Sequence, residues 1–129
     1  LALHGLGDYQ AAIAYHQQDL AIAQELGDRR GIGQALGNLG FAYYALGDYS
    51  QALGCEEKYL DISRTMEFRE GEAIALSNMG ETYLCLGRYP EAKESLQRAL
   101  EITREIGDRH GEAEGLKNLP ELHQHLDHR

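Results

Sequence analysis

The side chains that could hold a metal ion or act as a nucleophile are two cysteines and the histidines near the end of the chain. His123 and His125 are two residues apart and would lie on different faces of a helix, whereas metal chelation needs ligands that converge. Cys85 and His125 are 40 residues apart, a spacing that recurs in this sequence, so they could approach one another. A zinc site or a Cys/His nucleophile would still need further ligands or an orienting group, and none repeats beside this pair. We therefore expect no metal, no cofactor and no catalytic centre.

Cys55 and Cys85 are the cysteines of the chain, and both fall inside helical patterns. This usage is typical of small thiols in a reducing compartment, so we expect a cytoplasmic protein, with a disulfide or a metal pair as the alternative. The sequence has no glycine-rich phosphate loop, no nucleophile elbow and no HExxH motif. These observations argue against an enzyme and favour a binding function.

The composition limits the class of partner. The 129 residues contain 21 acidic and 12 basic side chains, which gives a formal net charge of -9. This charge repels phosphate backbones and anionic lipid headgroups, so we expect neither nucleic acid nor a membrane as partner. No apolar run approaches the roughly 18 residues of a membrane span. A hydrophobic content of 43% can support a core in a chain of this length.

Landmark residues recur at a fixed spacing of 40 positions. Seven of them and their counterparts are, in order, Asn38, Leu39, Gly40, Tyr43, Leu46, Gly47 and Tyr49, then Asn78, Met79, Gly80, Tyr83, Leu86, Gly87 and Tyr89. Such a period indicates an array whose units bury their apolar faces against one another. We predict one elongated domain over 1–129, which we expect to be a piece of a longer protein. Its units are an incomplete first repeat (1–27), two repeats (28–67 and 68–107) and an incomplete, degenerate last repeat (108–129).

Apolar residues within each unit step by three and four positions, the spacing of one helix face. The pattern predicts helices near 8–26, 50–66, 70–86 and 90–106, and a further helix between Asp28 and Gly47. Asp8 would be the N-cap of the first helix. Short connections make neighbouring helices antiparallel, so the predicted fold is all-α.

The turns between helix pairs form a repeated module, LGDRRG, MEFREG and IGDRHG. In the middle copy Glu67 and Phe68 replace the Gly-Asp pair, which weakens the helix caps of that turn. Gly40 recurs as Gly80 in mid-helix, where glycine costs about 1 kcal/mol relative to alanine, so we expect close helix contact there. Pro120 replaces this glycine in the last unit and should kink, shorten or delay the final helix.

Glu56 takes a position on its helix that His16 and Leu96 take in the neighbouring units. A half-buried carboxylate at this position would be strained, because burial disfavours an unpaired charge. We expect its side chain to turn towards solvent.

These elements resemble the tetratricopeptide repeat family, in the 40-residue form of Pins-like and rapsyn-like scaffolds and many bacterial repeat proteins. The resemblance rests on Asn-Leu-Gly followed by Tyr, on the Leu-Gly-x-Tyr turn, and on the outer-helix alanines Ala12, Ala52 and Ala92. It covers nearly the whole chain. It implies a right-handed superhelical solenoid of antiparallel helix pairs, and a non-catalytic scaffold that binds a peptide or partner helix in its concave groove.

The resemblance also implies which residues line the groove. The family places there, at the positions of Asn38, Asn78 and Asn118, residues whose amides can hold a peptide backbone. These asparagines precede a core position, so they point away from the packed seam and offer both a donor and an acceptor. The alternative is that they bond to a neighbouring helix and stiffen the stack. In the same register the groove face includes Phe41, Tyr44, Ile74, Glu81, Leu84, Lys117 and Glu121.

The groove combines an apolar end (Phe41, Tyr44, Ile74 and Leu84) with an acidic end (Glu81, Glu114 and Glu121). The form of the family that clamps a C-terminal carboxylate uses lysines and arginines on these faces, and here Lys117 alone fits. We therefore expect a partner with an apolar anchor and a basic flank, an amphipathic or extended peptide. The alternative is a solvated acidic face with no ligand.

Arg29, Arg69 and Arg109 stand at the starts of the inner helices, at the rim of the groove. Their guanidinium groups could pair with acidic groups of a partner, since the planar fork matches a carboxylate. The alternative is that they pair with Asp28, Asp108 or nearby glutamates in their own turns.

Self-assembly is the alternative function. We expect the helix near 8–26 to leave Ala12, Ile13 and Leu20 without a neighbour, and the last helix to be without the outer helix that follows it in a full repeat. Complementary open ends of this kind predict head-to-tail homo-oligomers.

Overall fold

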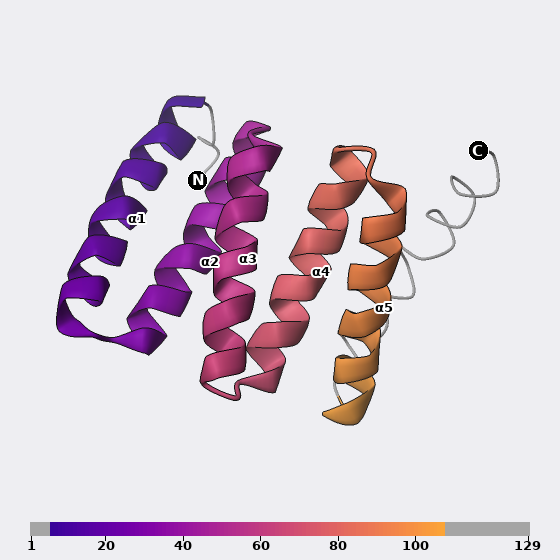
Figure 1. Ribbon diagram of the computed structural model, residues 1–129. Helices are drawn as coiled ribbons and strands as arrows, with labels where there is room; N and C mark the ends of the chain where they lie inside the picture. Colours follow the sequence, from indigo (N-terminus) through magenta and orange to yellow (C-terminus); the bar gives the residue numbers. More distant parts are fainter. Residues whose placement is uncertain (1–5, 108–129) are drawn as a thin grey trace.

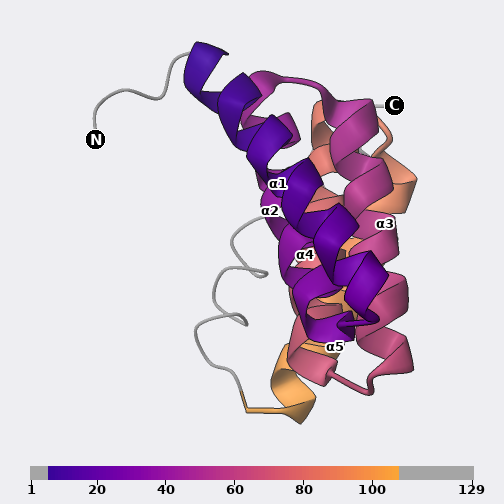
Figure 2. The same ribbon diagram turned by 90° about the vertical axis from the view of Figure 1, so that its left-hand side faces the viewer.

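The computed structural model describes residues 6–107 of the chain. The helices in this range are α1 (Leu6–Leu26), α2 (Arg29–Leu46), α3 (Tyr49–Thr65), α4 (Arg69–Cys85) and α5 (Tyr89–Glu105). Each helix packs against the next along the chain, and Figure 1 shows them side by side in one row. After a turn of 90°, Figure 2 shows α2 and α3 on opposite sides of this row. The described chain is an all-α repeat solenoid of antiparallel helices, as the sequence predicts.

The predicted and observed helix bounds differ by one residue for α3, α4 and α5. The start of α1 differs from the predicted one: the helix begins at Leu6, so Asp8 lies within its first turn and not ahead of it. Gly7 is part of the helix, whereas Gly47, its counterpart, has a φ of 88° and ends α2 ahead of Asp48. The prediction of an N-cap at Asp8 is therefore wrong.

The turns before α2 and α3 each have a glycine in the left-handed region followed by a capping aspartate. The Oδ1 atom of Asp28 accepts a hydrogen bond from the N–H of Gly31 at 3.1 Å, and that of Asp48 from the N–H of Gln51 at 3.3 Å. In the turn before α4 the left-handed residue is Glu67, with a φ of 56°, and the N-cap makes no side-chain hydrogen bond. This turn has neither the left-handed glycine nor the capping aspartate, as its sequence predicts.

The core is a seam between successive helices, in which Leu76 and Leu96 are each 1% exposed. A Cβ placed on Gly80 would lie 2.5 Å from the Cγ of Leu96, and one on Gly40 would lie 3.4 Å from the Cγ of Glu56. Close helix contact at both glycines is thus confirmed. Members of the largest cluster are Leu53, Leu60, Ala73, Ala75, Leu76, Met79, Tyr83, Ala92, Leu96, Ala99 and Ile102.

Predictions for the last repeat lie outside the described residues. They concern Arg109, Glu114, Lys117, Asn118, Pro120, Glu121, His123 and His125. Within 6–107, no helix has both the length and the apolar character that a membrane span requires.

Candidate binding groove

A pocket of about 280 Å³ lies between α2 and α4 and reaches α3 behind them. Its lining residues are Phe41, Tyr44, Glu56, Asn78 and Glu81. Four of these were predicted as groove residues from the sequence, and the fifth, Glu56, was not. We refer to this site as the α2–α4 pocket.

Helix periodicity places the four predicted residues. Phe41 and Tyr44 are three residues apart on α2, as are Asn78 and Glu81 on α4, and residues at this spacing share one helix face. Phe41 is 69% exposed, which is unusual for a phenylalanine in a folded chain. In the α2–α4 pocket, two aromatic rings from α2 therefore lie opposite an amide and a carboxylate from α4.

Tyr44 is held in place by contacts on both sides. Its hydroxyl lies 3.5 Å from the Sγ of Cys85 on α4, at hydrogen-bonding distance for sulfur, and its ring meets that of Tyr49 edge-on with centroids 5.5 Å apart. The hydrogen bond to Cys85, together with burial, raises the pKa of Tyr44 above its usual range. Tyr44 thus stays neutral and forms a fixed aromatic wall that links α2 to α4.

Glu56 lies at the back of the α2–α4 pocket and is only 4% exposed. The expectation that it turns towards solvent is wrong. Its Cγ packs over Gly40, which leaves room for the side chain, and the hydroxyl of Thr82 donates a hydrogen bond to its Oε2 at 3.1 Å. Its Oε1 is buried without a hydrogen-bond partner. Burial raises the pKa of Glu56 to about 7, which the hydrogen bond from Thr82 partly opposes.

The repeat contained a signal for this burial. Glu56 follows Gly40 by the same 16 positions that separate Leu96 from Gly80, and each packs over its glycine. Because Glu56 takes the position of a fully buried leucine, it is expected to be buried as well. Sequence reasoning used the position of Glu56 in its helix but did not pair it with the glycine on the preceding helix.

The remaining predicted groove residues on the described helices lie elsewhere. Asn38 lines a separate pocket of about 230 Å³ with Ile22 and Leu26 of α1. Ile74 is 42% exposed but does not line the α2–α4 pocket. Leu84 is partly buried and packs against the core cluster.

Of the three predicted rim arginines, Arg69 forms ion pairs within the chain. It donates to both carboxylate oxygens of Glu72 at 3.2 and 3.3 Å and pairs with Glu105 of α5. The Nε of Arg64 lies 3.6 Å from the same Glu72, so the network links α3, α4 and α5. Arg29 lines a different pocket, of about 610 Å³, formed by the start of α2, the end of α3 and the turn before α4.

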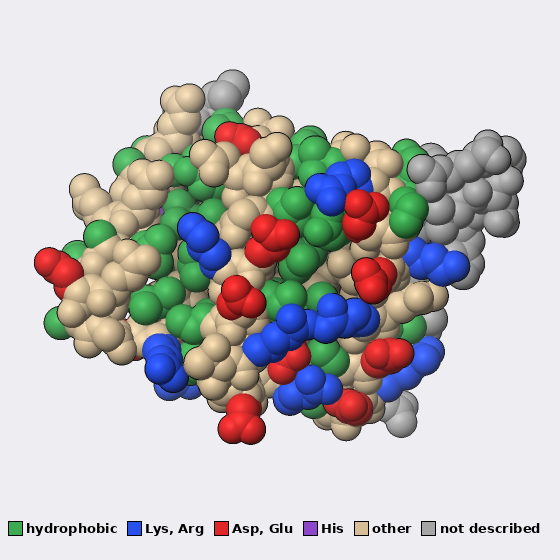
Figure 3. Space-filling model, in the orientation of Figure 1, with side chains coloured by type: hydrophobic (Ala, Val, Ile, Leu, Met, Phe, Trp, Pro, Cys, Tyr) green, Lys and Arg blue, Asp and Glu red, His purple; other side chains and the backbone are tan. Residues whose placement is uncertain are grey.

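The two thiols and the face over α3 and α5 show no feature of a further site on the described chain. Cys55 and Cys85 are both free, and burial raises the pKa of the Cys55 thiol. Among residues 6–107, no three His, Cys, Asp or Glu side chains are grouped so as to hold a metal ion. Figure 3 shows the face seen in Figure 1, where acidic and basic side chains are interspersed over α3 and α5. Such a mixture is typical of a solvated surface.

A family model described as "Tetratricopeptide repeat" matches residues 1–65 and 71–129, which is nearly the whole chain. A comparison with curated proteins finds no match.

Proposed function

The chain belongs to the tetratricopeptide repeat family, and on that premise we propose that it is a non-catalytic scaffold that binds a peptide or partner helix in the groove between α2 and α4. Repeats of this family generally mediate protein–protein interactions. The 40-residue Pins-like and rapsyn-like type stays a prediction from the sequence.

The observation that supports this groove is the α2–α4 pocket itself. Two helices that are not consecutive in the chain contribute to it, and its walls combine the exposed ring of Phe41, the half-buried amide of Asn78 and the carboxylate of Glu81. An extended peptide could lay an apolar side chain against the ring and bond its backbone to the amide. The acidic character of the site and of the whole chain favours a basic or amphipathic partner.

A selection of random dodecapeptides against the full chain tests the proposal. The combined variant Asn78→Ala with Glu81→Gln should lose binding of the selected peptides without a lower thermal midpoint. A matched control is Gln97→Ala with Glu94→Gln, which makes the same chemical changes at exposed positions of α5. Equal binding by the native chain and the groove variant would show that the groove is assigned to the wrong face.

Self-assembly is a second candidate, which the apolar surface of α1 favours. Tyr15, Ile22 and Leu26 are 62%, 54% and 75% exposed. Contact of this surface with a second copy would bury it. Light scattering over a range of concentrations should then show association that Ile22→Glu weakens, and a monomer at every concentration would exclude this function.

A further inference from the structure

We propose that the α2–α4 pocket takes up a single basic side chain, a lysine or arginine of the bound peptide, whose cation pairs with Glu56. The inference rests on the proposed function and specifies the chemistry of the same groove. It goes beyond a general preference for basic partners, because it names the carboxylate and the depth at which the cation binds.

The first supporting observation is the hydrogen bonding of Glu56. One carboxylate oxygen accepts from Thr82, while Oε1 is buried and without a partner, although the side chain lines an open pocket. Buried polar atoms are nearly always satisfied, and an unsatisfied one calls for an explanation. Within the described residues, no Lys or Arg forms an ion pair with Glu56. A cation from a ligand would supply the missing donor.

The second observation is the chemistry of the walls. The rings of Phe41 and Tyr44 can cover the aliphatic stem of a lysine and attract its cation through their π faces. Glu81 adds a second carboxylate to the lining, and the amide of Asn78 can accept a further hydrogen bond. An acidic side chain would be repelled by both glutamates, and an apolar one would leave Oε1 of Glu56 unpaired.

The charged and titratable groups around Glu56 are consistent with this choice. Glu81 of α4 and Glu57 of α3 both raise its pKa, and no basic side chain of residues 6–107 is among the causes of that shift. Lys58 acts on the Cys55 thiol, and the guanidinium carbon of Arg88 lies 4.8 Å from the centroid of the Tyr83 ring. The site is thus an acidic, partly aromatic pocket, and no Lys or Arg of the described helices lines it.

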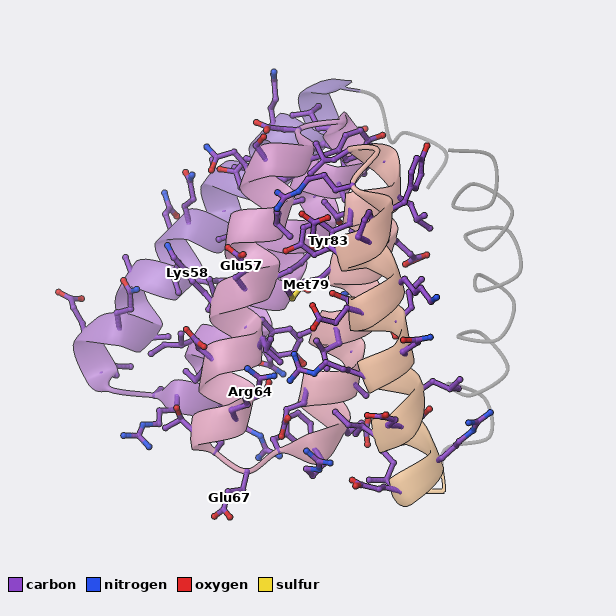
Figure 4. The ribbon with its side chains drawn as sticks, turned by 45° about the vertical axis from the view of Figure 1, so that its right-hand side comes forward. Glu57, Lys58, Arg64, Glu67, Met79 and Tyr83 are labelled. Carbon is purple, nitrogen blue, oxygen red and sulfur yellow. The ribbon has the colours of Figure 1, made fainter. Side chains whose placement is uncertain are left out.

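The test compares peptides selected against the native chain and against Glu56→Gln. Glutamine keeps the shape of the side chain and an acceptor for Thr82 but removes the charge. Peptides selected on the native chain should share a lysine or arginine, and those selected on the variant should not. Glu57→Gln is the matched control, since Glu57 is exposed and lies on α3 beside Lys58, away from the pocket lining (Figure 4).

A double-mutant cycle then locates the cation. Replacing the shared lysine of a selected peptide by norleucine keeps the stem and removes the ammonium group. This change should weaken binding at least about tenfold on the native chain and on Glu57→Gln, but less than about threefold on Glu56→Gln. Phe41→Ala gives a second variant whose folding is not in question, because the ring is mostly exposed, and it should weaken the lysine peptide more than the norleucine peptide.

Two results would overturn the inference alone. One is enrichment of peptides without a basic residue, and the other is an equal loss from norleucine on the native chain and on Glu56→Gln; in both cases the groove would stand if Asn78→Ala with Glu81→Gln still abolishes binding. Two other results would count against the proposed function as well. One is that the selected peptides bind the native chain and the variant Asn78→Ala with Glu81→Gln equally well, and the other is that no peptide is enriched.

Discussion

Gly80→Ala tests the packing of the repeat most directly, because its effect opposes helix propensity. Alanine should stabilise the middle of α4 by about 1 kcal/mol relative to glycine. The new Cβ, however, would lie 2.5 Å from the Cγ and 2.6 Å from the Cδ2 of Leu96. Leu96 is 1% exposed, and the closest atom is its Cγ, which rotation about the Cβ–Cγ bond does not move. Overpacking of this kind costs about 1–3 kcal/mol.

We therefore expect Gly80→Ala to lower the free energy of unfolding by up to about 2 kcal/mol, the cost of the clash less the propensity gain. Gly54→Ala is the matched control, because Gly54 is also inside a helix and a Cβ there meets nothing within 4 Å. That variant should gain up to about 1 kcal/mol. Gly40→Ala should fall between the two, since its nearest neighbour is the Cγ of Glu56 at 3.4 Å.

The assay is urea denaturation of the full chain followed by far-ultraviolet circular dichroism, with the three variants measured beside the native chain. The sign of the change should differ between Gly80→Ala and Gly54→Ala. Equal stabilisation by both would refute the reasoning, because it would mean that α4 and α5 do not approach as closely as the structure shows.

Three further predictions concern the turns and the buried carboxylate. Glu67→Gly should raise the free energy of unfolding by about 0.5–1 kcal/mol, because glycine tolerates the positive φ at this position; no gain in thermal midpoint would contradict this. Asp48→Ala should cost about 1 kcal/mol in urea denaturation through loss of the hydrogen bond to the N–H of Gln51, and an unchanged midpoint would argue against the cap. Burial raises the pKa of Glu56 from 4.5 to about 7, so the folded state binds the proton more tightly and the native chain loses stability relative to Glu56→Gln as pH rises through this window. The difference in the free energy of unfolding between the native chain and Glu56→Gln should be near zero below this pH window and reach about 2 kcal/mol above it. This value is discounted because the pocket is open to solvent, and a difference that does not change with pH would exclude the raised pKa.

Much of the fold follows from local sequence signals. The positions of α3, α4 and α5 were predicted to within one residue, because helix periodicity acts over short distances. Gly7 shows the limit of this reasoning, since the same Gly-Asp pair that ends α2 at Gly47 continues as helix in α1. A Gly-Asp pair alone therefore does not determine that a helix ends there.

The candidate site was predicted in part. Phe41, Tyr44, Asn78 and Glu81 meet in one pocket because the 40-residue register puts them on the equivalent faces of α2 and α4, which both line it. Asn38 follows the same register but lines another pocket, since its neighbours come from α1. The register fixes which face a residue is on, and the neighbouring helices decide what it meets there.

The sequence by itself determined the repeat, the helices and the small residues at which they approach, because each of these depends on short-range periodicity or on the steric needs of glycine. Only the tertiary structure decided the electrostatics. The ion pairs of Arg69 with Glu72 and Glu105 span three and 36 positions, and the burial of Glu56 requires Gly40 before it and Thr82 after it on two different helices. The energy of a charge depends on the solvent and the partners around it, and both are set by elements that are remote in the chain.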